Sequence, residues 1–85
     1  MNDEDELLAF VSRDLLSGRP DLTLAGDDDL LGSGLVDSLG VMRIVAFIEE
    51  RFGIVVPPED VRIEHFLTLR QIADYLTARR AADAA

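Results

Sequence analysis

The pair Asp37-Ser38 is the strongest candidate in this sequence for a site of chemical modification. It follows a Gly-rich stretch and stands at the start of an amphipathic segment. A serine at the start of a helix is accessible to another enzyme, and the helix dipole would favour a phosphate attached to its oxygen. Asp and Ser are also common N-cap residues, so the pair could serve only to begin a helix. The residues on either side decide between these interpretations.

The residues after this pair predict a helix that begins at Ser38 or Leu39 and ends at Phe52, with Gly53 as its C-cap. One arc of its helical wheel is the expected core face, and it contains Val41, Ile44, Val45, Ile48 and Phe52.

A different arc of the same helix is apolar as well. It carries Leu39, Met42 and Ala46, with Glu49 beside them. An outward apolar strip is typical of a surface that binds partner proteins, and Met makes such a surface adaptable. The alternative is that part of the strip packs against the preceding loop.

Two further helical patterns must position this segment. The first runs from about Asp3 to Leu16, with Asp3 and Glu6 as a capping box. The last runs from about Thr68 to Arg80, again with a capping box, and residues 81–85 are expected to fray. Their expected core faces are Leu7, Leu8, Val11 and Leu15 in the first helix, and Leu69, Ile72, Ala73 and Leu76 in the last.

A long connection from Ser17 to Asp37 separates the first two helices, and loops of this length are often functional. We expect one short turn at Asp28 to Leu31. Its apolar residues should pin it against the helices, and these are Leu22, Leu24, Leu30, Leu31, Leu35 and Val36. The second connection, from Val56 to Val61, reads as a chain reversal in which Pro58 begins a short helix. The run Ile54-Val55-Val56 is too short to build a sheet, so the expected fold is all-α.

The composition excludes several classes of function. The 85 residues carry a net charge of −9, and all eight basic residues are arginine, which argues against nucleic acid binding. No apolar run approaches the ~20 residues that cross a bilayer, and the acidic N-terminus is unlike a signal peptide. We therefore expect a cytoplasmic protein without a membrane segment. The chain has no cysteine, so a thiol for thioester chemistry would have to come from a cofactor.

Taken together, the motifs resemble those of the acyl carrier and peptidyl carrier protein family. The resemblance extends from about Leu7 to Leu76. It rests on Asp37-Ser38-Leu39, on the approach Leu30-Leu31-Gly32-Ser33-Gly34-Leu35, on Glu49-Glu50-Arg51-Phe52-Gly53, on Val56-Pro57, and on the closing pattern of Phe66, Thr68, Leu69, Ile72, Ala73, Tyr75 and Leu76.

The length allows one domain over residues 1–85, with a core of about residues 4–80, and we expect a monomer. The resemblance implies that this carrier domain is a four-helix bundle. Its third helix would be short, near Pro58 to Ile63. A phosphopantetheinyl transferase would attach 4′-phosphopantetheine to Ser38, next to Asp37, using its own magnesium. The carrier would have no catalysis and no metal site of its own. Its acyl or aminoacyl cargo would come from a loading enzyme and pass to a synthase, transferase or tailoring enzyme. Partner contacts would be made by Leu39, Met42, Ala46, Glu49 and Glu50.

The chain departs from the fatty acid carriers of this family, which resemble Gly-Ala-Asp-Ser-Leu-Asp where this chain has Leu35-Val36-Asp37-Ser38-Leu39-Gly40. Gly40 follows Ser38-Leu39 where those carriers have an acid, and Arg43 also stands where they usually place one. The Leu35-Val36-Asp37-Ser38-Leu39 form and His65-Phe66 look more like stand-alone carriers of amino acids or unusual acyl units. We therefore favour polyketide or nonribosomal peptide type biosynthesis, with a D-alanyl or fatty acid carrier as the alternative.

Other functions explain fewer residues. Asp27-Asp28-Asp29 suggests a calcium loop, but Ser38 stands where an EF-hand needs its bidentate Glu. A hydrolase acting through Ser38 would have His65 as its only candidate base, and no strand precedes the serine. An unmodified helical interaction domain would have the same outward strip and acidic surface. Attachment of phosphopantetheine, detected by intact mass, would separate that domain from a carrier.

Overall fold

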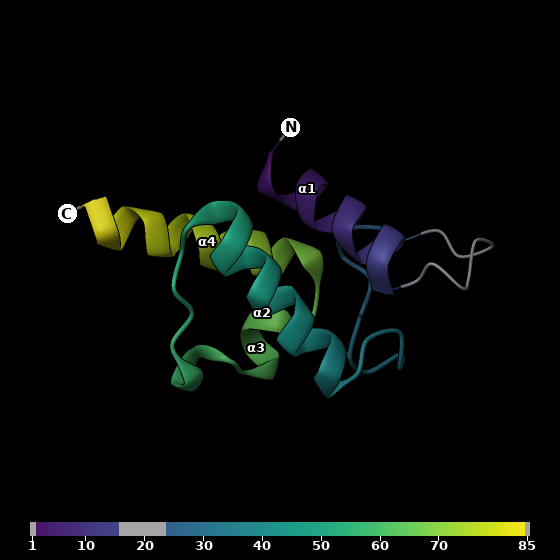
Figure 1. Ribbon diagram of the computed structural model, residues 1–85. Helices are drawn as coiled ribbons and strands as arrows, with labels where there is room; N and C mark the ends of the chain where they lie inside the picture. The colour runs from purple at the N-terminus through teal and green to yellow at the C-terminus, as the bar shows by residue number, and fades with distance from the viewer. Residues whose placement is uncertain (1, 16–23, 85) are drawn as a thin grey trace.

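The computed structural model describes residues 2–15 and 24–84, with side chains as far as residue 82, and the described residues form helices joined by turns (Figure 1). This arrangement confirms the predicted all-α bundle. The elements in chain order are α1 (Asp3–Phe10), the π-helical turn η1 (Val11–Leu15), α2 (Ser38–Phe52), the 3₁₀ turn η2 (Pro58–Asp60), α3 (Ile63–Phe66) and α4 (Leu69–Ala84). Leu16 and Leu22 of the sequence analysis lie outside the described residues.

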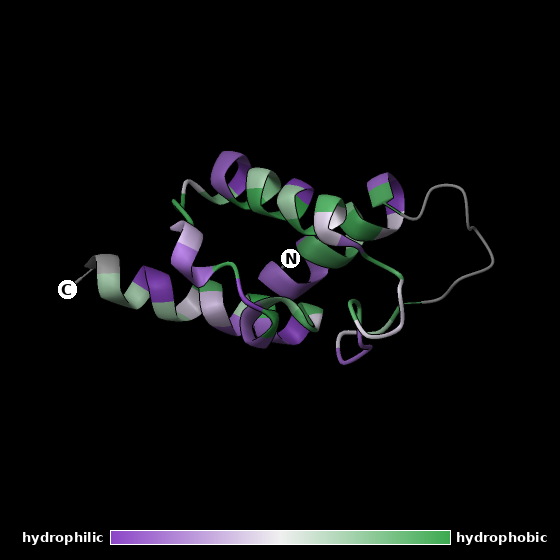
Figure 2. Ribbon diagram, turned by 90° about the horizontal axis from the view of Figure 1, so that it is seen from below, coloured by the Kyte–Doolittle hydropathy of each residue, from purple (hydrophilic) through white to green (hydrophobic). Residues whose placement is uncertain are grey.

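The core is apolar throughout the described residues. α4 packs against both α1 and α3, and the hydrophobic sides of the helices are turned inward (Figure 2). The side chains that are fully buried come from every helix and from the loop before α2, and they include Leu7, Val11, Leu30, Ile44, Ile48, Phe66, Leu69, Ile72 and Leu76. None of the described helices is both long enough and apolar enough to cross a membrane.

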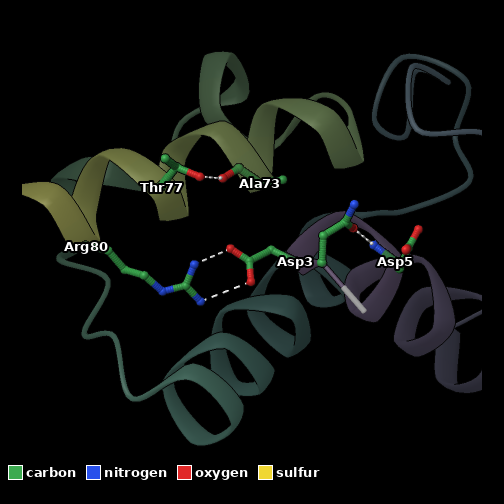
Figure 3. A network of polar contacts seen from close by, with 6 residues as sticks. Asp3, Asp5, Ala73, Thr77 and Arg80 are labelled. Carbon is green, nitrogen blue, oxygen red and sulfur yellow. Dashed lines mark hydrogen bonds and ion pairs between the residues drawn. The ribbon is translucent and has the colours of Figure 1, made fainter.

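The first helix begins at Asp3, as predicted, but its cap differs from the prediction. Asn2, not Asp3, is the N-cap, and its side chain accepts a hydrogen bond from the Asp5 backbone N–H at 2.8 Å. Asp3 therefore lies inside the helix, and its carboxylate is free to form an ion pair with Arg80 of α4 (Figure 3). The guanidinium of Arg51 in α2 is likewise 2.5 Å from Glu6, so neither residue of the predicted capping box caps the helix.

The helix that precedes Ser17 changes geometry within its length. The α-helix ends at Phe10 and continues as a π-helical turn to Leu15. Val11 in this turn is fully buried, and the Phe10 ring stacks on Phe47 of α2 with 4.2 Å between ring centroids. The π-helical turn, with its wider backbone, thus begins next to the contact between the first helix and α2.

The short third helix is not where the resemblance implied. Pro58 begins a short 3₁₀ helix at Pro58–Asp60, as predicted, but the α-helical turn follows only at Ile63–Phe66, after extended backbone at Arg62. The phenol of Tyr75 donates a 2.6 Å hydrogen bond to the Asp60 carboxylate and so fixes the 3₁₀ turn to α4. This long-range anchor is a tertiary feature that residue spacing in the segment does not indicate.

The last helix begins as predicted but ends later. Thr68 Oγ1 accepts a hydrogen bond from the Gln71 backbone N–H at 3.0 Å, which is one half of the predicted capping box. The other half is missing, because the buried Gln71 Oε1 has no hydrogen-bond partner among the described residues. The helix continues beyond Arg80 to Ala84, in keeping with the strong helix propensity of its alanines, so the predicted end near Arg80 is wrong.

Candidate functional site

The start of α2 presents Ser38 to solvent. Asp37 is the N-cap residue: its backbone is extended, and its Oδ1 accepts a hydrogen bond from the Gly40 N–H at 2.8 Å. The Asp37 carbonyl oxygen accepts the N–H of Val41 at 2.9 Å. Ser38 is the first helical residue and is exposed. Its hydroxyl therefore lies at the rim of the bundle, as predicted, at the positive end of a fifteen-residue helix.

The loop before α2 is fixed to the bundle at several points. Leu30 is buried, and its N–H donates a 2.8 Å hydrogen bond to the Leu67 carbonyl oxygen next to α3. The Val36 N–H donates back to the Leu30 carbonyl oxygen at 2.9 Å. Between them Gly34 has a φ of +80°, a conformation that favours glycine. These contacts close the chain into a compact turn that delivers Asp37 and Ser38 to a defined place.

Gly40 has a packing role at this place. A Cβ atom added there would lie 2.7 Å from Cγ1 of Val36, which is itself buried. The loop can therefore lie close against the first turn of α2 only because residue 40 has no side chain. This contact explains why a glycine stands two residues after Ser38. The glycine therefore need not indicate the strand-to-helix turn in which hydrolases place their nucleophilic serine.

Two acidic residues of the loop stabilise turns. Asp28 accepts a hydrogen bond from the Ala25 N–H at 2.8 Å, and Asp29 accepts one from the Gly32 N–H at 2.6 Å. The described residues contain no group of three or more metal-ligating side chains. Capping of turns accounts for Asp28 and Asp29.

An apolar cleft opens beside Ser38. Its volume is about 500 Å³, and it lies between the first turns of α2 and the segment that ends in α3. The walls are formed by Leu31, Val36, Asp37, Ser38, Val41, Met42, Val61, Arg62, Ile63 and Phe66. The residues present fit a phosphopantetheine group: an exposed hydroxyl at the helix N-terminus could hold the phosphate, and the adjoining cleft could receive an apolar chain.

The predicted partner strip is exposed along α2. Leu39 retains 69% and Met42 56% of its accessible surface, and Ala46 is exposed as well. The opposite face is buried, as predicted, through Val41, Ile44, Val45 and Ile48, while Phe52 is partly buried. The alternative, in which the strip packs against the loop, therefore does not hold for Leu39 or Met42.

The two glutamates at the far end of α2 differ in what they contact. Glu49 is exposed, yet its Oε2 accepts a 3.1 Å hydrogen bond from the Val56 backbone N–H. It therefore holds the segment after α2 in addition to any role toward a partner. Glu50 is exposed and lies by a second cleft, of about 460 Å³, on the side of α1 and η1.

Sequence reasoning missed two residues beside the site. Ile63 retains 67% of its accessible surface at the start of α3 and shares the cleft with Ser38 and Met42. Arg62 also lines this cleft, and its guanidinium is 3.3 Å from Glu64. In the sequence, these residues are indicated only by the order of a charged residue, Arg62, followed by an apolar one, Ile63, in the segment after Pro58.

His65 does not act on Ser38. Its ring lies against Tyr75, with 4.9 Å between ring centroids, and no hydrogen bond joins it to the serine in the part of the chain that the structure describes. Burial and the hydrogen bond to Asp60 raise the pKa of Tyr75 to about 12. The single histidine thus packs beside a neutral phenol, and a catalytic triad has no support.

Comparison with known proteins gives consistent results. Residues 6–76 match the family described as "Phosphopantetheine attachment site". The chain is 43% identical over 86 residues to the "Acyl carrier protein" of Streptomyces coelicolor, covering 96% of this chain and 90% of that protein. It is 38% identical over 56 residues to the "D-alanyl carrier protein" of Abiotrophia defectiva, covering 66% of this chain and 71% of that protein.

A solved structure has a similar fold. It is described as "Crystal structure of FAD-dependent dehydrogenase", and the TM-score is 0.74 at 30% sequence identity. The match covers 82% of this chain and 97% of the matched chain, so the matched chain is the shorter of the two.

Proposed function

The chain belongs to the phosphopantetheine attachment-site family of carrier proteins, and on that premise we propose that Ser38 is its attachment residue. A member of this family is a carrier with covalent 4′-phosphopantetheine and is not an enzyme. The observation that carries the assignment of Ser38 is its exposed hydroxyl on the first residue of α2, at the mouth of the apolar cleft. The attached group would supply the thiol that this cysteine-free chain lacks.

The residues around Ser38 have distinct roles in this proposal. Asp37 orients the serine by capping α2 through the Gly40 N–H. The helix N-terminus favours the negative phosphate. Met42 and Ile63 stand at the cleft and would shield an apolar cargo from water. The partner strip of Leu39, Met42 and Ala46, with Glu49 and Glu50 beyond it, would bind the transferase, the loading enzyme and the enzymes that receive the cargo.

The proposed role is the transport of acyl or aminoacyl thioesters in polyketide or nonribosomal peptide type biosynthesis. Arg43 and Gly40 support this role, because they make the start of α2 less acidic than in fatty acid carriers. The alternative is a D-alanyl or fatty acid carrier, and the likeness to D-alanyl carrier proteins and to an acyl carrier protein favours it. These roles differ in cargo, so the mass of the acyl group on protein purified from the source organism decides among them. D-alanine on that protein would overturn the proposed role in polyketide or nonribosomal peptide type biosynthesis.

One class of tailoring enzyme has a specific observation in its favour. The similar solved structure is that of an FAD-dependent dehydrogenase by its description, while its matched chain is shorter than this one. We therefore include a flavin enzyme among the proposed partners. It would remove two hydrogens from the tethered cargo and pass them to its FAD. After hydrolysis of the thioester, the acid released from the native carrier would then be two hydrogens lighter than the acid that the loading enzyme activates, and equal masses would contradict this partner.

We also propose that the chain is a monomeric, cytoplasmic carrier with a single domain. The domain core of about residues 4–80 includes all the buried residues described above. Light scattering should give the mass of one chain, and a dimer mass would contradict the proposal.

The decisive experiment is phosphopantetheine attachment. The purified chain is incubated with coenzyme A, magnesium and a promiscuous phosphopantetheinyl transferase, and its intact mass is measured. We expect a gain of one phosphopantetheine, absent in Ser38→Ala. Ser33→Ala is the matched control, because Ser33 is an exposed serine in the adjoining loop, and this variant should be modified. A modified Ser38→Ala would overturn the site assignment, and an unmodified wild type would favour the interaction domain.

A further inference from the structure

Beside the partner strip lies a cation to which the proposed function assigns no partner contact. Arg43 is exposed on α2 and makes no ion pair or side-chain hydrogen bond with any residue that the structure describes. Every other arginine among those residues has an acidic or carbonyl partner; these are Arg13, Arg51, Arg62, Arg70, Arg79 and Arg80. Arg43 is therefore the exception among the described arginines of a chain with 17 acidic residues and 8 basic ones.

The isolation of Arg43 follows from its position on the helix. No acidic residue occurs in α2 from Ser38 to Ile48. The nearest carboxylate before this stretch, that of Asp37, accepts the N-cap hydrogen bond from Gly40. An exposed guanidinium without an internal partner contributes no ion pair to the fold, so its charge is available to a second molecule.

Arg43 lies at the edge of an open cleft next to the serine. This cleft, of about 250 Å³, is lined by Leu15 of η1, by the loop before α2 and by Leu39. It is a different cleft from the one that holds Met42 and Ile63. A partner that covers Leu39 would therefore meet Arg43 one helical turn farther along.

The other end of the exposed strip carries the opposite charge. Glu50 is seven residues after Arg43, about 10 Å along a helix axis, and it is exposed. From the Ser38 end, the exposed surface of α2 thus carries the apolar side chains of Leu39 and Met42, then the positive group of Arg43, and the negative group of Glu50 at its far end. A surface with this order of charges is complementary to only one orientation of a charged partner.

We propose that partner enzymes cover Leu39 and Met42 with an apolar patch and, farther along α2, place an acidic side chain against Arg43 and a basic side chain against Glu50. This inference rests on the proposed carrier function. The charge order fixes the direction in which the carrier docks, and the reverse orientation would bring like charges together. Arg43 is thus a specificity-determining residue, and it excludes partners whose surface is basic throughout.

The test measures loading of the holo protein. The probe is the loading enzyme of the source organism. It is purified by following its ability to acylate the wild-type holo protein, and the acylation is detected by intact mass. Each variant is first converted completely to the holo form. For Arg43→Glu we expect KM to rise about tenfold, which corresponds to about 1.4 kcal/mol, with kcat within about twofold. Arg43→Lys keeps the charge and should load nearly as wild type.

The matched control is Arg70→Glu, which makes the same change of net charge on α4. Arg70 lies 3.6 Å from Glu4 on the first helix, away from the strip. Its KM should change less than about twofold. An unchanged KM for Arg43→Glu, or an equal rise for Arg70→Glu, would overturn the inference while the carrier function stands. A wild type that accepts no phosphopantetheine would overturn both.

Discussion

Two regions of the molecule use charged and apolar side chains in opposite ways. Along the first helix, Glu4, Glu6 and Asp3 each pair with an arginine of α2 or α4, and the apolar residues beneath them are buried. At the start of α2, Leu39 and Met42 are exposed and Arg43 has no partner among the described residues. In the first region the charged side chains are paired and the apolar side chains are buried within the molecule, so both support the fold. In the second region the charged and apolar side chains stay exposed, so they are available to bind other proteins.

The largest contrast is expected between two neighbours on α2. Ile44 is fully buried, so Ile44→Ala should lower the free energy of unfolding by about 2–5 kcal/mol. Met42 retains 56% of its accessible surface, so Met42→Glu should change that free energy by less than about 0.5 kcal/mol while weakening partner enzymes. Urea denaturation followed by circular dichroism measures both. An unfolded Met42→Glu would show that the strip belongs to the core.

A smaller effect should separate the two N-caps. Asp37 caps α2 and Thr68 caps α4 with hydrogen bonds of 2.8 and 3.0 Å. Asp37→Ala and Thr68→Ala should each cost about 1 kcal/mol of stability. Only Asp37→Ala should also slow phosphopantetheine attachment, because it releases the turn that positions Ser38.

The check for the caps is the initial rate of attachment by intact mass, measured under conditions in which both variants are folded. Equal slowing in the two variants would mean that stability alone controls modification. The start of α2 would then have no special role in presenting the serine.

The smallest effect compares two arginines. Arg80→Gln removes the ion pair with Asp3 that joins α4 to the first helix, and it should cost about 0–1 kcal/mol at low salt and less at high salt. Arg43→Gln removes no internal partner and should leave the free energy of unfolding unchanged within about 0.5 kcal/mol. Thermal melts at two salt concentrations measure both. A larger loss for Arg43→Gln than for Arg80→Gln would reverse the distinction between the two regions.

Much of the candidate site could be predicted because it depends on local pattern. The period of apolar residues in α2 placed Ile44 inside and Met42 outside, and it placed Ser38 at the helix start behind its capping Asp37. The predictions that were wrong involved competition between neighbours. Asn2 and Asp3 can both cap a helix, and the sequence pattern does not rank them. Pro58 does begin a short 3₁₀ helix, but the third α-helix begins at Ile63, which the pattern did not separate from it.

The sequence by itself determined which segments are helical, which face of α2 is buried and where the serine stands, because side-chain periodicity and caps act over a few residues. Only the tertiary structure decided which acid meets which arginine, where the third helix lies, and that a cleft opens beside Ser38. Those features depend on contacts between residues far apart in the chain, such as Asp3 with Arg80 and Asp60 with Tyr75. The same packing left Arg43 without a partner among the described residues.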